Sequence, residues 1–118
     1  MPNSFSPELS GTVSDAMDSP VRYEDGRVFV DGEMTVYTCG DLKSRLLAEL
    51  TDHADVTELD LARVIEIDTA GLQLLLVARR HAGGTGRDLR FSNPSRPVLD
   101  VLALCRLGAL VAAAADAR

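Results

Sequence analysis

The feature that most constrains this chain is the stretch of residues 60–72, which reads DLARVIEIDTAGL. Its first part is typical of the end of a buried strand, and a short connector follows. Asp68-Thr69-Ala70-Gly71 then opens a long apolar segment with the length and composition of a buried helix. We therefore expect this joint, with the hydroxyl of Thr69 at its centre, to organise the rest of the molecule and its function.

Two strands and a helix are predicted ahead of this joint. Asp25-Gly26 is a two-residue hairpin signal, which predicts antiparallel strands over residues 21–24 and 27–31. Gly32-Glu33-Met34-Thr35 is expected to carry the chain off the sheet. Thr38 and Asp41 fit a capping box for a helix that stops near residues 52–53. Its predicted buried stripe is Leu42, Leu46, Leu47 and Leu50.

The remaining elements alternate between strand and helix. A short strand is predicted over residues 56–61, a helix over 70–82 that Gly83-Gly84 ends, and a strand over 89–92. Ser95 is a predicted N-cap for a last helix, with Pro97 in its first turn and Gly108 at its end. The apolar stripe predicted for that helix is Val98, Val101, Leu102 and Cys105.

This order of elements predicts an α/β fold. Helices between successive strands imply crossover connections and a parallel portion of sheet, and the leading hairpin makes the sheet mixed. We expect a small mixed β-sheet with helices packed mainly on one face. The domain is predicted over residues 21–111, after a disordered lead-in at 1–20 and before a frayed tail at 112–118.

Composition restricts the class of protein. The chain has 118 residues and a formal net charge of −6, which argues against a nucleic-acid partner. The N-terminus lacks the pattern of a signal peptide, and no apolar run reaches the roughly 20 residues that span a bilayer. We therefore expect a cytoplasmic protein without direct membrane insertion. Cys39 and Cys105 are expected to be reduced thiols, with a disulfide between them as the alternative.

Thr69 permits two interpretations. Asp68 or Thr69 could simply cap the helix that follows, since short polar side chains accept hydrogen bonds from the first helical N–H groups. Alternatively, the Thr69 hydroxyl could be a site of phosphorylation, because a phosphate is well placed beside helix N-terminal amides and adds about −1.5 to −2 charges. A partner docked on the apolar helix would then face a hydrated dianion and dissociate.

Other candidate chemistry is weaker. The stretch GGTG at residues 83–86 follows a helix and precedes a strand, which is the wrong context for a phosphate loop, so a turn is expected. His53 with Asp55, and His81, do not form a metal-ligand set. Cys39 lacks a basic activator nearby. We therefore expect no metal, no cofactor and no enzymatic activity of the chain's own.

The residues around the joint resemble a known family. Leu59-Asp60-Leu61 followed by Ile67-Asp68-Thr69-Ala70-Gly71-Leu72 is similar to the signature of the STAS domain, found in sulphate transporters and anti-sigma-factor antagonists. The resemblance extends over nearly everything after residue 20, including Gly32-Glu33-Met34 and the exit at Asn93-Pro94. Two differences stand out: Thr69 lies where many antagonists have Ser, and Thr35 lies near the place of a frequent acidic residue.

The resemblance implies a partner-switching protein. In that family a kinase-type anti-sigma factor binds the domain, phosphorylates the hydroxyl residue after the Asp and thereby ends binding until a phosphatase acts; here that residue is Thr69. The expected turn and partner-binding residues are Asp68, Ala70, Gly71, Leu72, Gln73 and Leu76, in a monomer or weak dimer. Two alternatives stay open: a constitutive accessory subunit of a phospholipid-trafficking ABC transporter, and a regulator in a chemotaxis or two-component system.

Overall fold

A computed structural model of the chain describes residues 19–107. The elements are β1 (Val21–Glu24), β2 (Arg27–Met34), α2 (Cys39–Asp52), β3 (Glu58–Ile67), α3 (Thr69–Gly83), β4 (Arg90–Ser92) and α4 (Arg96–Leu104). Most of the expected lead-in, the tail and the expected helix stop at Gly108 lie outside the described residues. Ser19 and Pro20 are described, and the Pro20 carbonyl accepts a hydrogen bond from the Asp31 N–H at 2.8 Å.

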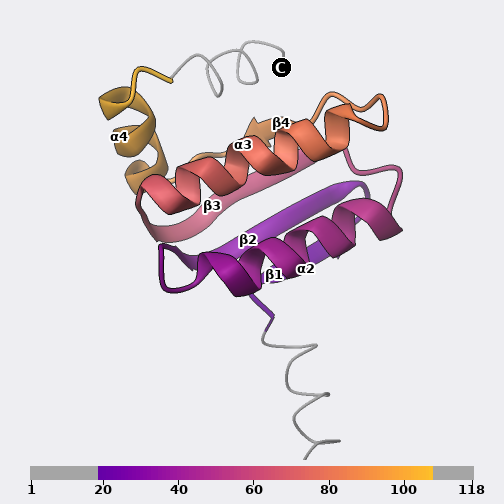
Figure 1. The fold of residues 1–118 in the computed structure, drawn as a ribbon, viewed down its shortest axis with the longest axis horizontal. Helices are drawn as coiled ribbons and strands as arrows, with labels where there is room; N and C mark the ends of the chain where they lie inside the picture. Colours follow the sequence, from indigo (N-terminus) through magenta and orange to yellow (C-terminus); the bar gives the residue numbers. More distant parts are fainter. Residues whose placement is uncertain (1–18, 108–118) are drawn as a thin grey trace, which may run out of the picture.

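The four strands form one mixed sheet in the order β1-β2-β3-β4. β1 pairs antiparallel with β2 through the Asp25-Gly26 hairpin, whose two residues both have positive φ. β3 is parallel to β2 and to β4. Helices α2 and α3 run side by side over one face of this sheet, and α4 packs near one end of β3 (Figure 1). The predicted mixed sheet with helices mainly on one face is confirmed.

The core lies between the sheet and the two long helices. Alternate residues of β2 and β3, including Val28, Val30 and Leu59, point toward α2 and α3 and are fully buried, as a half-covered sheet requires. The predicted stripe of α2 is confirmed for Leu42, Leu46 and Leu50, while Leu47 is half-buried against the core.

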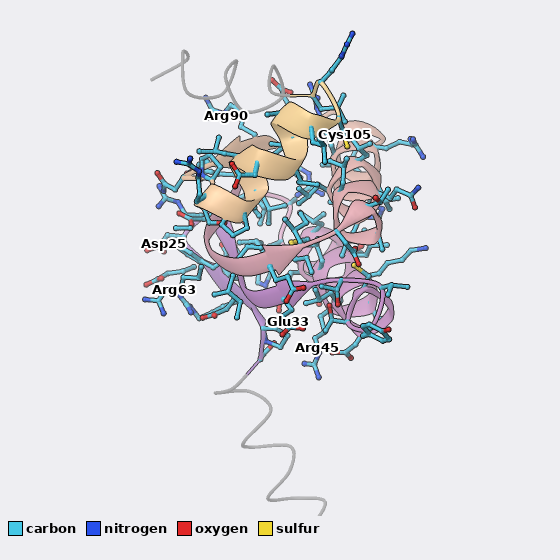
Figure 2. All side chains as sticks on the ribbon, turned by 90° about the vertical axis from the view of Figure 1, so that its left-hand side faces the viewer. Asp25, Glu33, Arg45, Arg63, Arg90 and Cys105 are labelled. Atoms are coloured by element: carbon cyan, nitrogen blue, oxygen red, sulfur yellow. The ribbon has the colours of Figure 1, made fainter. Side chains whose placement is uncertain are left out.

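The other face of the sheet carries charged side chains beside Phe29. The guanidinium groups of Arg22 and Arg27 lie 4.7 Å and 5.8 Å from the centre of the Phe29 ring, so they cover the aromatic residue of that face. Asp25 and Arg63 also lie on this side, away from α2 and α3 (Figure 2).

Both central strands are longer than predicted. β2 continues through Gly32 to Met34, and β3 runs through the supposed connector to Ile67, so that only Asp68 separates it from α3. Two register shifts between β2 and β3 account for the error, one between Phe29 and Asp31 and one next to Gly32. Bulges of this kind interrupt the two-residue alternation from which a strand is recognised.

Two smaller predictions are wrong. Thr38 precedes α2, but its side chain makes no capping bond to that helix; its Oγ1 donates to the Glu33 carbonyl and accepts from the Thr35 N–H. The capping box with Asp41 is therefore not formed. In α4, Val98 and Leu102 are buried as predicted, whereas Cys105 follows the helix and is exposed. Cys39 is half-buried, and both thiols are free.

Candidate functional site

The candidate site lies at the edge of the sheet where β2 and β3 both end. Met34 pairs with Ile67 in the parallel register, so the loop after β2 and the joint after β3 start side by side. A hydrogen bond from the Asp68 N–H to the Met34 carbonyl at 3.2 Å ties them together. Parallel strands bring the segments that follow them to one edge, which is where α/β proteins form binding sites.

Asp68 links the two segments through its side chain. Its Oδ1 accepts a hydrogen bond from the Gly71 N–H at 3.2 Å, which caps α3. Its Oδ2 accepts one from the Val36 N–H at 2.9 Å, which holds the loop that follows β2. The Val36 N–H and, to a smaller extent, the α3 amides lower the pKa of Asp68, because they stabilise the carboxylate form.

Thr69 is the first residue of α3 and is exposed to solvent. Since Asp68 accepts the capping hydrogen bond, the cap interpretation holds for Asp68 and not for Thr69. Among residues 19–107, the Thr69 hydroxyl has no hydrogen-bond partner. The sequence left the two readings of this joint open; the structure assigns the cap to Asp68 and leaves the Thr69 hydroxyl accessible.

Gly71 sets how closely α3 approaches the sheet. A Cβ atom built at this position would overlap the Met34 carbonyl oxygen and lie 2.7 Å from Cγ1 of Ile67. Only a glycine lets the first turn of α3 pack this closely against the ends of both strands. Ala70, beside it, is half-buried.

The three residues expected to contribute to a partner surface lie in different environments. Gln73 is exposed and Leu76 is half-buried, so both present side-chain surface. Leu72 is only 4% exposed and instead packs in the core. The apolar excess of α3 is therefore explained mostly by burial against the sheet, α2 and α4.

The loop that follows β2, beside Asp68, was not predicted from the sequence. Val36 and Tyr37 are 65% and 93% exposed, although both are large apolar residues. Exposed apolar side chains next to each other often mark a binding surface. The sequence contains a signal for this loop. Val36 and Tyr37 form an apolar pair between two threonines, directly after β2, the strand that neighbours β3.

The first residue of α2 lies close to this loop. Burial, and then the negative charge of Asp68, raise the pKa of the Cys39 thiol, because both disfavour the thiolate. The environment of Cys39 therefore favours the protonated thiol over the thiolate.

Residues 19–107 contain no group of three or more His, Cys, Asp or Glu side chains arranged to bind a metal ion. Within the same residues, no helix has the length and apolar character needed to cross a membrane.

Comparison with known proteins identifies the fold and family. The family model described as "Mlab, STAS domain" matches residues 21–112. A protein from Thermotoga maritima described as an anti-sigma factor antagonist has a similar structure, with a TM-score of 0.64 and 22% identity over 78% of this chain and 81% of that one.

A second similar structure is the anti-sigma factor antagonist SpoIIAA in its unphosphorylated form. It has a TM-score of 0.59 and 18% identity, over 77% of this chain and 83% of that one. Among curated proteins, none matches this chain significantly.

Proposed function

This chain belongs to the STAS family, and we propose that it is a phosphorylation-controlled protein-interaction module that acts as an anti-sigma-factor antagonist. In this proposal the unmodified chain binds a kinase-type anti-sigma factor or a related ATPase and thereby frees the sigma factor. Phosphorylation of Thr69 ends binding, and a phosphatase restores it. The chain itself contributes a binding surface and a phosphoacceptor, and no catalysis.

The observation that carries this proposal is the state of the Thr69 hydroxyl. It is exposed at the start of α3, and Asp68 performs the capping that would otherwise occupy it. A kinase could transfer the γ-phosphoryl group of ATP to Oγ1, with loss of the hydroxyl proton and release of ADP, without breaking a hydrogen bond within residues 19–107. The first α3 amides lie beside the resulting phosphate and favour its negative charge.

The neighbours of Thr69 explain how a phosphate would affect binding. The new dianion would adjoin the Asp68 carboxylate, which holds the Val36 N–H at 2.9 Å. Repulsion between the two negative groups would weaken this bond and disturb the loop that carries the exposed Val36 and Tyr37. A partner packed on that loop would also have to desolvate the phosphate, which is costly without a paired cation.

A second candidate function is a constitutive accessory subunit of a phospholipid-trafficking ABC transporter. The description "Mlab" of the matching family model favours it. The form Asp-Thr-x-Gly-Leu at residues 68–72, which resembles that of the STAS subunit of such a transporter, favours it too. In that case the same loop and α3 surface would dock permanently on an ATPase, and Thr69 would contribute a hydroxyl to the interface. A regulator in a chemotaxis or two-component system would also bind a partner through this surface under the control of phosphorylation at Thr69.

The two functions are distinguished by affinity purification from the native cell, followed by mass spectrometry. The baits are the wild-type chain, Thr69→Ala, Thr69→Glu and the control Thr57→Glu, which places the same charge on an exposed threonine ahead of β3. We expect wild type and Thr57→Glu to recover a histidine-kinase-like ATPase. Thr69→Glu should fail to recover it. Phosphate on the wild-type chain, absent from Thr69→Ala, would support the same proposal.

Other outcomes would contradict the switch. If wild type and Thr57→Glu recover an ABC ATPase and no phosphate is found on Thr69, the accessory-subunit function is favoured. If Thr57→Glu loses the partner as completely as Thr69→Glu does, the effect is one of general charge and not of the joint at Asp68 and Thr69.

A further inference from the structure

A pocket of about 230 Å³ lies where α2 and α3 both end. The two helices begin at the edge of the sheet that carries Thr69 and run side by side to the opposite edge, on the right in Figure 1. Residues at or just beyond the two helix ends line the pocket: Leu50, Thr51, Ala54, His81, Thr85 and Arg87. A ligand bound here would leave Thr69 and the loop that follows β2 uncovered.

The charge of the lining sets this pocket apart in an acidic chain. Among residues 19–107, none of those that line it is acidic, although 18 of the 118 residues of the chain are Asp or Glu. Asp55, which follows Ala54, accepts a hydrogen bond from the Tyr23 hydroxyl of β1 at 2.6 Å and does not line the pocket. Arg87 brings a full positive charge to the lining. The pocket therefore favours an anion over a cation.

The two helix ends do not cancel this preference. Carbonyl groups at a helix C-terminus carry partial negative charge, which disfavours an anion. Here they are paired: Arg87 donates to the Leu50 and His53 carbonyls at 2.7 and 3.0 Å. The Ala82 carbonyl of α3 accepts from the Thr85 hydroxyl at 2.8 Å. Of the five N–H groups of Arg87, four bond acceptors within residues 19–107, which leaves one on Nη2 for a ligand.

A further donor comes from a pair of side chains that bridges α2 and α3. The Oγ1 atom of Thr51 lies 3.2 Å from Nε2 of His81. If Nε2 carries the ring proton, it donates to Thr51, and the Thr51 O–H is left for a ligand. If the hydroxyl donates instead, the ring proton of a neutral His81 is on Nδ1, which is then the remaining donor. Either arrangement gives the pair one donor beyond its own hydrogen bond.

Donor groups beside an apolar lining define the class of ligand. Leu50 is fully buried and, with Ala54, forms the apolar part of the pocket. The pocket is smaller than the roughly 300–1,000 Å³ of sites for drug-sized ligands. We propose that it binds a short aliphatic carboxylate, either a free acid or the C-terminal residue of a protein. The carboxylate oxygens accept from Arg87 and from the Thr51–His81 pair, and the alkyl chain lies against the apolar part. This inference does not rest on the proposed function.

The test is an NMR titration of the ¹⁵N-labelled full chain with sodium butyrate at constant ionic strength. We expect saturable shifts of the amides of Thr51, Ala54 and Thr85, with a Kd of about 1–10 mM. Ala54→Leu, which fills the pocket from an exposed position, should weaken binding about tenfold or more. The double variant Thr51→Val/His81→Leu should weaken it about fivefold, because a donor to a charged group is lost. The control Thr57→Val changes an exposed threonine outside the pocket and should leave the Kd unchanged.

Two further ligands test the chemistry of the pocket. The amide n-butyramide has the size of butyrate without its charge, so it should bind about tenfold more weakly. The peptide acetyl-Gly-Gly-Val with a free C-terminal carboxylate distinguishes the two sources of the ligand. Binding tighter than that of butyrate assigns the pocket to a protein C-terminus, and weaker binding assigns it to a free acid.

Three results would overturn the proposal. One is shifts that do not saturate with butyrate. Another is equal binding of n-butyramide, which would mean that the pocket does not recognise the carboxylate. The third is a Kd that neither Ala54→Leu nor the double variant changes, which would place butyrate elsewhere. The titration involves no partner protein and no change at Thr69, so its outcome is independent of the phosphorylation switch.

Discussion

At the scale of single residues, Asp68 is the organising group of the site. One carboxylate caps α3 at Gly71 and holds the neighbouring loop at Val36. Within residues 19–107, the adjacent hydroxyl of Thr69 therefore has no hydrogen-bond partner. The sequence placed both residues at the joint but could not tell which of them caps the helix, because either side chain can accept the same hydrogen bond.

Asp68 gives a prediction about pH. Its pKa is lowered by the amides that it accepts from, so its contribution to stability is complete above the pKa of the unfolded chain, about 3.9. That contribution is lost as the pH falls through the lower pKa of the folded chain. Urea unfolding should show wild type more stable than Asp68→Asn at pH 7, with a difference that shrinks below about pH 4. A difference independent of pH would contradict the assignment.

Gly71 gives a prediction about packing. Gly71→Ala should lower the free energy of unfolding by about 1–3 kcal/mol, since the new methyl group overlaps the Met34 carbonyl and the helix must shift. Gly83 is the matched control in the same helix, where a Cβ would meet open space. Gly83→Ala should stabilise the protein by about 0.5–1 kcal/mol. Both values can be measured by urea unfolding, and equal effects would contradict the close approach.

At the scale of elements, those with a strong local signal in the sequence were predicted most accurately. The hairpin at Asp25-Gly26 and the helix α3 were predicted to within one residue, because a turn dipeptide and a long apolar run are unambiguous. β2 was predicted too short because Gly32 suggests a strand end, and β3 because its two-residue alternation is interrupted where the register shifts. In the folded chain Gly32 has φ +100° and lies at a register shift within the ladder.

One contact between elements was not visible in the sequence. The guanidinium group of Arg87 donates to the carbonyls of Leu50, His53 and Val56 at 2.7, 3.0 and 3.2 Å. It thus satisfies carbonyls at the end of α2 and in the loop before β3, more than 30 residues away in the chain. No pattern around residue 87 indicates such a distant partner.

Arg87→Ala should therefore destabilise the fold by about 1.5–3 kcal/mol, since it leaves those carbonyls without a charged donor. Arg87→Lys should recover only part of this loss, because lysine lacks the planar fork. Arg79→Ala, at an exposed position of α3, should stay within about 0.5 kcal/mol of wild type. Chemical denaturation of the three variants measures these values, and a neutral Arg87→Ala would contradict a clamping role.

At the scale of the whole molecule, parallel pairing explains why the site exists. β2 and β3 are paired in parallel, so the segments that follow them start at the same edge of the sheet. Residues 35–38 therefore meet the joint at Asp68 and Thr69, although about 30 residues separate them. The order of strands and helices was enough to predict the mixed sheet. It was not enough to place the loop that carries Val36 and Tyr37 beside Asp68, because that requires knowledge of where β2 ends.

The central claim is that a phosphate on Thr69 controls binding at this edge of the sheet. The most direct measurement uses the ATPase that the wild-type chain recovers. Its affinity is measured for the full chain with phosphothreonine at position 69 and for the unmodified chain. We expect phosphorylation to weaken binding at least 100-fold, about 2.7 kcal/mol or more, since an unpaired dianion must be desolvated. Equal affinity of the two forms would contradict the account, because it would mean that the partner does not contact position 69.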